Sequence, residues 1–222
     1  MAVVGFDLDG TLVDSVGDIA QAVNAMLADR RLPPQPESAV RRFIGDGARQ
    51  LVLRSLRAAS LVVGDDDALV DDALQQFRTH YGKDPVGATR AFIGIDAALA
   101  RLAHHTLVVV TNKPGVFARP IVEAIFPGQI ALVVGPDDVG CQKPDPRVLV
   151  AVAERLGRPV DVFVGDSGTD VGVARAAQIP VVGVTWGLRP EEVAHADVVV
   201  ADPDALADAV LGLLSRVEAA HR

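Results

Sequence analysis

The chain has 222 residues, 50% of them hydrophobic and 23% charged, and its formal net charge is −8. This length allows one α/β domain plus an insertion around a sizeable core. An acidic chain repels nucleic-acid phosphates unless it carries a basic stripe, and the arginines adjoin only at residues 30–31 and 41–42. We therefore expect no nucleic-acid partner. The single cysteine, Cys141, excludes an internal disulfide and a cysteine-based zinc site.

The first apolar segment begins at residue 2 or 3, which leaves no room for a signal peptide. No apolar run approaches the length that a membrane-spanning helix needs. We therefore expect a cytoplasmic protein without a membrane partner. We expect it to be a monomer or a homodimer.

A strand is predicted over residues 3–6, and Asp7 and Asp9 follow it directly. Because side chains alternate along an extended chain, both carboxylates can point the same way. Gly10 allows a tight turn and the close approach of a ligand. Neighbouring carboxylates repel each other unless they share a proton or a cation, and oxygen ligands suit Mg²⁺. Alone, this string is equally typical of an ordinary turn.

Residues 15 to about 80 show helical patterns and no convincing strand. The first helix is expected after Asp14 or Ser15, either of which can cap it. Further helices are expected over residues 37–43, from the turn at 45–47 to about 56, and from the acidic residues 65–67 to about 81. Nearly a hundred residues separate the first two strands, although a parallel crossover needs only a dozen or more. An inserted helical cap is therefore predicted over residues 15–87, with residues 1–14 and 88–222 forming the core.

The rest of the chain alternates between strands and helices. Strands are expected at residues 106–110, 131–134, 162–164, 181–184 and 198–200, and helices at about 97–103, 117–125, 146–156 and 171–177. Near-continuous Val and Ile runs are typical of strands that are buried on both faces. The pattern predicts an α/β fold with a parallel sheet and helices on both faces.

Ligands of such sheets bind outside the carboxyl ends of the strands. Polar residues do follow the predicted strands rather than precede them: Asp7 and Asp9 after the first, residues 111–113 after the second, residues 135–145 after the third and residues 165–170 after the fourth. Lysine is rare here, with three residues at positions 83, 113 and 143 beside eighteen arginines. Its presence at position 143, before a proline, is therefore informative, whereas Lys113 is as consistent with a surface residue as with a binding one.

These groups suit phosphate-ester hydrolysis, which can need acceleration of up to ~10²¹-fold, whereas one general acid supplies only about 10²–10⁴-fold. A nucleophile, a metal and fixed positive charge must therefore act together. One carboxylate can attack phosphorus, and another can protonate the leaving oxygen. Lys143, Thr111 and a metal held by Asp166 and Asp170 can neutralise or bind the phosphoryl oxygens.

Four segments, taken in order, resemble the motifs of the haloacid dehalogenase superfamily. They are residues 7–11 (Asp-Leu-Asp-Gly-Thr), residues 110–112 (Val-Thr-Asn), residues 143–144 (Lys-Pro) and residues 165–170 (Gly-Asp-Ser-Gly-Thr-Asp). Each motif is weak alone, but the set is specific and spans essentially residues 2–190. Residues 44–48, 111–114, 143–146 and 186–187 look like those of phosphoglycolate phosphatases and their near relatives.

The resemblance implies a Rossmann-like parallel sheet core with an inserted all-helical cap. It also implies a catalytic set of Asp7 as nucleophile, Asp9 as acid and base, and Thr111 and Lys143 on the phosphoryl group. Mg²⁺ would be held by Asp7, the Asp9 carbonyl and Asp166, with Asp170 in support. Further substrate-binding donors would be Gly10, Thr11 and Asn112, together with cap residues Gly45 to Arg49, which are equally consistent with a helix start.

The sequence therefore predicts a Mg²⁺-dependent phosphatase that acts on a small phosphorylated metabolite through an aspartyl-phosphate, with phosphoglycolate as the leading substrate. Sugar phosphates, an amino-sugar acid phosphate and pyrophosphate remain alternatives, as do a phosphomutase and a non-enzymatic phosphometabolite sensor. A dehalogenase is disfavoured, because its leaving group needs no proton and Asp9 would have no task. The stretch from Gly135 to Gln142 departs from the relatives, with no predicted consequence.

Overall fold

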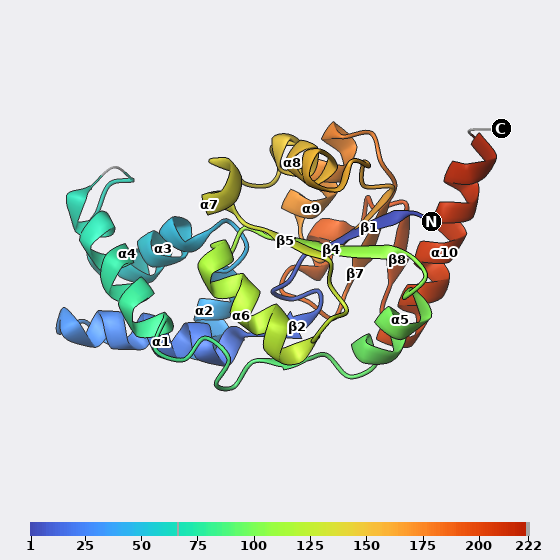
Figure 1. Ribbon diagram of the computed structural model, residues 1–222. Helices are drawn as coiled ribbons and strands as arrows, with labels where there is room; N and C mark the ends of the chain where they lie inside the picture. The colour runs from blue at the N-terminus through green and yellow to red at the C-terminus, as the bar shows by residue number, and fades with distance from the viewer. Residues whose placement is uncertain (66, 221–222) are drawn as a thin grey trace. The chain divides into compact units, whose positions relative to one another are not determined.

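The computed structural model describes residues 1–65 and 67–220 (Figure 1). The chain divides into two compact units. The core unit comprises Met1–Asp14 and Ala91–Arg222, and the helical unit comprises Ser15–Arg90. Among the described residues, no helix is both long enough and apolar enough to cross a membrane.

The core unit is built on a six-stranded sheet in the order β5-β4-β1-β6-β7-β8. The strands are β1 (Val3–Phe6), β4 (Thr106–Val110), β5 (Leu132–Val134), β6 (Val162–Gly165), β7 (Val181–Val184) and β8 (Val198–Val200). Every neighbouring pair runs parallel, and the first strand lies between β4 and β6 with Gly5 opposite Val108 and Phe163. The mixed α/β fold with a parallel sheet is therefore confirmed.

Helices cover both faces of this sheet, as its valine-rich strands require. They are α5 (Ile95–Arg101), α6 (Gly115–Ile125), α8 (Arg147–Leu156), α9 (Gly168–Ala176) and α10 (Leu206–Ala220). Figure 1 shows α8 and α9 on one side of the sheet and α5 and α6 on the other. This is the arrangement that right-handed crossovers produce when the strand order reverses direction after β5. The reversal places a gap between loops at the carboxyl edge, where ligands of open sheets bind.

The helical unit contains α1 (Val16–Asp29), α2 (Glu37–Phe43), α3 (Ala48–Ala58) and α4 (Ala68–Tyr81). Its expected helices are confirmed. Ser15 is the N-cap residue of the first helix, as expected, but its side chain makes no capping hydrogen bond. The cap of α4 does form, because the Asp67 carboxylate accepts from the Leu69 N–H at 2.9 Å. Asp66, part of the same expected acidic start, lies outside the described residues.

Buried Asp18 fixes the end of the helical unit to its first helix. Its carboxylate accepts from the backbone N–H groups of Ala88 and Thr89 and from the Thr89 hydroxyl, at 2.8, 2.8 and 2.6 Å. A buried carboxylate needs such donors to offset the loss of water. Residues 88–89 are therefore held to α1.

Several elements of the structure were not expected from the sequence. They are the two-residue strands β2 (Val13–Asp14) and β3 (Arg90–Ala91), which pair with each other, the short helix α7 (Pro136–Val139), two 3₁₀ turns at Pro190–Val193 and Pro203–Ala205, and helix α10. The last of these carries a detectable signal, because Leu206, Val210, Leu213 and Leu214 recur at helical spacing and are buried. Strands of two residues carry no such periodicity.

Candidate active site

The polar residues expected to meet at the carboxyl edge of the sheet do meet there. Asp7 and Asp9 follow β1, Thr111 follows β4, and Asp166 follows β6. Lys143, from the segment after α7, is 2% exposed, and Asp7 and Asp166 are 8% and 1% exposed. These ionisable groups are therefore buried together, which requires them to be paired or to hold a metal.

Lys143 is the cation at the centre of this group. Its Nζ donates to Asp7 Oδ1 at 2.6 Å and to Asp170 Oδ1 at 2.6 Å. The centre of the Phe163 ring, which belongs to a buried residue of β6, lies 5.4 Å from the same nitrogen. Burial alone would lower the pKa of Lys143, but the negative charges of Asp170 and Asp7 outweigh it and raise the pKa to about 12. Lys143 therefore provides a permanent positive charge beside Asp7.

The backbone of Lys143 is clamped by Asn112. The Asn112 side chain donates from Nδ2 to the Lys143 carbonyl at 3.1 Å and accepts from the Lys143 N–H at 2.8 Å. This reciprocal pair joins the loop after β4 to the segment that carries the lysine. Asn112 was predicted to bind substrate. In the structure, Asn112 positions Lys143 through these two hydrogen bonds. A direct contact of Asn112 with substrate stays a prediction.

Asp166 is enclosed by backbone and glycine. Its Oδ2 accepts from the Leu188 N–H at 2.6 Å, and the Thr11 hydroxyl lies 3.3 Å from Oδ1. A Cβ placed on Gly10 would lie 2.3 Å from Oδ2, and one placed on Gly187 would lie 2.4 Å from the same oxygen. Glycine is therefore required at both positions by the close approach of this carboxylate. Gly10 also adopts φ +93°, where a side chain is strained.

Asp170 lies in the first turn of helix α9 and faces inward. Its Oδ2 accepts from the backbone N–H and the hydroxyl of Ser167, at 3.1 and 2.6 Å, while Oδ1 accepts from Lys143. The carboxylate is completely buried. A Cβ on Gly165 would lie 2.2 Å from the Asp170 Cβ, so the strand and the helix start are in close contact. Asp170 thus holds the lysine and the end of β6 together.

The carboxylates of Asp7, Asp166 and Asp170 each offer an oxygen, and the three oxygens lie within 4.8 Å of one another. Oxygens around an octahedral Mg²⁺ at about 2.1 Å are roughly 3.0–4.2 Å apart, so small side-chain shifts would bring these three to one ion. Hard oxygen ligands are the donors that Mg²⁺ prefers. The residues present therefore fit the metal that the sequence predicts.

The charges of the site also favour a bound divalent cation. Asp7, Asp9, Asp166 and Asp170 carry four potential negative charges, and Lys113 and Lys143 carry two positive ones. Burial raises the pKa of Asp7 to about 6 against the opposing charge of Lys143, and the charges of Asp170 and Asp9 add to the rise. Burial, together with the charges of Asp7 and Asp170, raises the pKa of Asp166 well above its usual range. A divalent cation would relieve this excess of negative charge.

Asp9 has its own cation. The Lys113 Nζ lies 2.8 Å from Asp9 Oδ1, and the two side chains are only 6% and 11% exposed. The Lys113 N–H donates to the Thr111 hydroxyl oxygen at 3.2 Å. Of the two interpretations of Lys113 left open by the sequence, the structure supports a residue of the site, since a surface lysine would be solvated.

The remaining predicted substrate-binding residues fall in two places. In the core unit, the N–H groups of Gly10 and Thr11 donate within their own loop, to the carbonyls of Val13 and Leu8 at 2.9 and 3.3 Å. In the helical unit, Gly45 adopts φ +121°, and Arg49 is paired with Asp71 and donates to the Asp65 carbonyl at 2.6 Å. Their contact with substrate stays a prediction.

Three groups of the site were missed from the sequence. The Leu188 N–H holds Asp166, and a backbone donor has no sequence signature. Ser167 braces Asp170, and its position three residues earlier is a recognisable capping spacing. Trp186 donates from its indole to the Thr11 carbonyl at 3.1 Å and so fixes the loop after β1.

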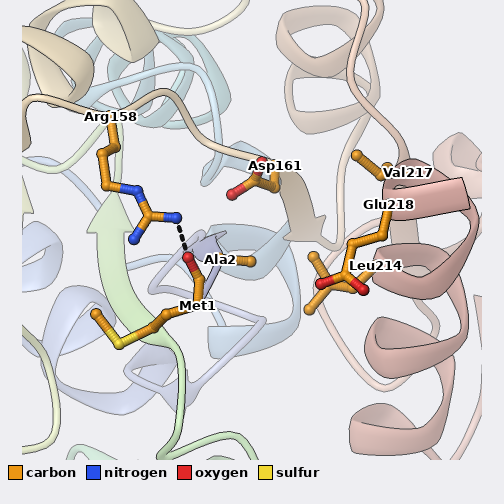
Figure 2. Close-up of a pocket in the computed structure, with 7 residues that line it drawn as sticks. All are labelled: Met1, Ala2, Arg158, Asp161, Leu214, Val217 and Glu218. Atoms are coloured by element: carbon orange, nitrogen blue, oxygen red, sulfur yellow. Dashed lines mark hydrogen bonds between the residues drawn. The ribbon is translucent and has the colours of Figure 1, made fainter. Parts of the chain in front are cut away.

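A cavity of about 540 Å³ lies elsewhere in the core unit (Figure 2). It is lined by Met1, Ala2, Arg158, Asp161, Leu214, Val217 and Glu218. Met1 and Ala2 precede β1 and Asp161 precedes β6, so the cavity is at the amino edge of a parallel sheet, opposite the carboxylates. Figure 2 shows Arg158 donating to the Met1 carbonyl. Its position separates it from the ionisable groups described above.

Comparison with known proteins agrees with this geometry. Residues 4–184 match the family of haloacid dehalogenase-like hydrolases. The phosphoglycolate phosphatase of Rhodospirillum rubrum is 41% identical over 196 residues, covering 85% of this chain and 81% of that protein, and that of Pseudomonas putida is 36% identical over 211 residues, covering 91% and 77%. The crystal structure of a predicted phosphoglycolate phosphatase from Haemophilus somnus superposes with a TM-score of 0.83 at 28% identity, covering 95% of this chain and 98% of that one. The chain belongs to the haloacid dehalogenase-like hydrolases and is an enzyme of that family.

Proposed function

We propose that this protein is a Mg²⁺-dependent phosphatase that hydrolyses a small phosphate monoester, with phosphoglycolate as the preferred substrate, through an aspartyl-phosphate on Asp7. The observation that carries the proposal is the contact of Lys143 Nζ with Asp7 Oδ1 at 2.6 Å, next to Asp166 and Asp170. The names of the relatives support the choice of substrate.

Asp7 is the residue suited to attack phosphorus, because it directly follows the central strand β1 and contacts a fixed cation, Lys143. Its carboxylate attacks the phosphoryl group while the ester oxygen leaves, and the product is an acyl phosphate on Asp7. Lys143 neutralises charge on the phosphoryl oxygens during the transfer, and the Thr111 hydroxyl binds one of them. The pairing with Asp170 and the clamp by Asn112 keep the ammonium in place.

Asp9 is suited to handle the proton. In the first step it donates to the leaving oxygen, and in the second it removes a proton from the water that hydrolyses the acyl phosphate. Mg²⁺, when held by Asp7, the Asp9 carbonyl and Asp166 with support from Asp170, supplies charge neutralisation for the transferred group. We also propose that the protein has no nucleic-acid or membrane partner, that it is a monomer or a homodimer, and that it is cytoplasmic.

A kinetic screen of phosphate esters with purified protein tests the proposal. We expect phosphate release that requires Mg²⁺ and is lost with a chelator, and the highest kcat/KM for 2-phosphoglycolate among a panel with sugar phosphates, an amino-sugar acid 6-phosphate and pyrophosphate. Conversion of a hexose 1-phosphate to its 6-phosphate would indicate a phosphomutase instead. No phosphate release from any compound with Mg²⁺ present would indicate a sensor and contradict the proposal.

A further inference from the structure

The second lysine of the site, Lys113, is not used by the chemistry proposed above. Lys143 already contacts Asp7 and Asp170, so it accounts for the cation beside the nucleophile. Lys113 instead pairs with Asp9, and its side chain is only 6% exposed. A buried ammonium loses its hydration, so interactions within the site must support it. The position of this second buried cation therefore needs its own explanation.

Lys113 is held rigidly from both sides along the chain. Its N–H donates to the Thr111 hydroxyl oxygen at 3.2 Å. Two residues further on, the Gly115 N–H donates to the Asp137 carboxylate at 2.6 Å, and the Val116 N–H donates to the same carboxylate at 3.3 Å. These backbone hydrogen bonds lower the pKa of Asp137 although burial opposes them. The loop that presents the ammonium is thus preorganised, which favours recognition of a ligand over a chance contact.

The distance to Asp9 places Lys113 beside the leaving group. A general acid must approach the ester oxygen to about 2.6–3.2 Å. Because Lys113 Nζ is 2.8 Å from Asp9 Oδ1, the ester oxygen and the ammonium share one carboxylate as neighbour. If both contact the same oxygen of Asp9, the ester oxygen and the ammonium nitrogen are no more than about 6 Å apart. If they contact different oxygens, the width of the carboxylate adds to this distance. In a 2-phosphoglycolate-like ester, ordinary bond lengths put a carboxylate oxygen up to about 3.5 Å from the ester oxygen, so this oxygen can come within hydrogen-bond reach of the ammonium.

We infer that Lys113 is a specificity-determining residue, and that its ammonium binds a carboxylate one carbon away from the ester oxygen while it remains beside Asp9. A lysine suits this task because its compact ammonium carries three N–H donors and can contact two anions at once. The substrate class is therefore an ester of phosphate with a short 2-hydroxy acid. The inference rests on the proposed phosphatase function.

Turnover of two matched esters tests the inference. Ethyl phosphate has the same ester oxygen and carbon chain as 2-phosphoglycolate but no carboxylate. We expect Lys113→Met to lower the ratio of kcat/KM for 2-phosphoglycolate to kcat/KM for ethyl phosphate by about 10- to 100-fold, the usual loss for a hydrogen bond to a charged group. Lys113→Arg keeps the positive charge and should retain most of the preference. An equal fall for both esters in Lys113→Met would overturn the inference, since Lys113 would then only position Asp9.

A binding measurement separates this inference from the proposed function. Calorimetric titration of 2-phosphoglycolate and ethyl phosphate into Asp7→Asn and into Asp7→Asn/Lys113→Met, with Mg²⁺ present, needs no turnover. The preference for 2-phosphoglycolate should fall about 10- to 100-fold with loss of Lys113. An unchanged preference overturns the inference even if the wild-type protein is an active phosphatase. A lost preference supports it even if the wild-type protein hydrolyses neither ester.

The chain provides a matched control lysine. Lys83 is exposed and belongs to the helical unit, where its N–H donates to the His80 carbonyl at 3.3 Å. Lys83→Met removes the same charge and should leave both kcat/KM ratios and both affinities unchanged. If circular dichroism shows that Lys113→Met does not fold, Lys113→Gln and Lys113→Arg are compared instead. Equal loss of the preference in the Gln and Arg variants would contradict recognition by charge.

Discussion

Lys143 and Asp7 are 136 positions apart in the chain, yet Lys143 Nζ donates to Asp7 Oδ1 at 2.6 Å inside a site from which water is largely excluded. The parallel sheet makes this contact possible, because it brings the loops after β1, β4, β5 and β6 to one edge. Asp170 takes a second N–H of the same ammonium, and Asp166 lies next to it. Nucleophile, fixed cation and candidate metal ligands are thereby adjacent before any substrate is present.

Loss of Lys143 should affect both rate and stability. Lys143→Met removes the charge that neutralises the transferred group, so we expect kcat to fall about 10²- to 10³-fold. The same change leaves Asp7 and Asp170 buried without their cation, which commonly costs about 3–5 kcal/mol of stability. Steady-state kinetics and urea unfolding measure the two effects. Lys143→Arg should recover more stability than activity, and a wild-type kcat in Lys143→Met would contradict the assigned role.

Asp166 should control metal affinity. Asp166→Asn removes one of three clustered carboxylates, and we expect the Mg²⁺ concentration for half-maximal activity to rise by at least about 10- to 100-fold. Calorimetric titration of Mg²⁺ into the variant provides a second readout that needs no turnover. The control is Asp208→Asn. Asp208 is an exposed residue of α10 that pairs with Arg101, so its substitution should leave the Mg²⁺ affinity unchanged. Equal Mg²⁺ affinities in the Asp166 and Asp208 variants would show that Asp166 is not a ligand.

Gly10 should tolerate no side chain. In Gly10→Ala the new Cβ would lie 2.3 Å from Asp166 Oδ2, so we expect loss of Mg²⁺ binding and of activity. Gly128→Ala is the matched control, since Gly128 also has a positive φ, +71°, but a Cβ there meets nothing within 4 Å. The control isolates the backbone strain of about 1–2 kcal/mol from the clash. If both variants lose stability equally and both stay active, close packing against Asp166 is not essential.

Much of this architecture follows from the sequence because its signals are local. Each strand of the main sheet is a short valine-rich run, and polar residues that reach the site follow four of them, β1, β4, β5 and β6. The strands β2 and β3 were missed because two residues show no periodicity. The expected capping bond of Ser15 is absent, since the residue type alone does not set the rotamer.

The sequence predicted which residues form the site better than it predicted the contacts between them. Asn112 holds the backbone of Lys143, and the Leu188 N–H holds Asp166. Both contacts join segments that are distant in sequence, and one of them involves only backbone, so no residue pattern identifies them. The pairing of Lys113 with Asp9 likewise depends on how the loop after β4 turns back toward β1.

The pH dependence of stability should report the buried Asp7. Without metal, burial raises the pKa of Asp7 from 3.8 to about 6, so the folded state holds this proton more tightly than the unfolded state. The contribution of Asp7 to the free energy of unfolding therefore falls as the pH rises from 3.8 to 6 and is constant above. Asp7→Asn removes this contribution.

Urea unfolding in the presence of a chelator, at several pH values, measures the difference between Asp7→Asn and the wild-type protein. We expect the variant to gain stability relative to the wild type as the pH rises through this range, by a few kcal/mol at most. Added Mg²⁺ should reduce the difference, because the metal stabilises the ionised wild-type carboxylate. A difference that stays flat with pH would mean that Asp7 ionises normally in the folded protein.

Trapping the phosphorylated enzyme tests the role of Asp7 most directly. p-Nitrophenyl phosphate has a leaving group that needs little help from an acid, so Asp9→Asn should still be phosphorylated but should lack the base for hydrolysis. Acid quenching followed by mass spectrometry of the tryptic peptide covering residues 1–30 detects the product. If Asp7 is the nucleophile, we expect one phosphoryl group on Asp7 in Asp9→Asn and none in Asp7→Asn/Asp9→Asn. An unmodified peptide, together with wild-type turnover by Asp7→Asn, would contradict the role of Asp7 as the nucleophile.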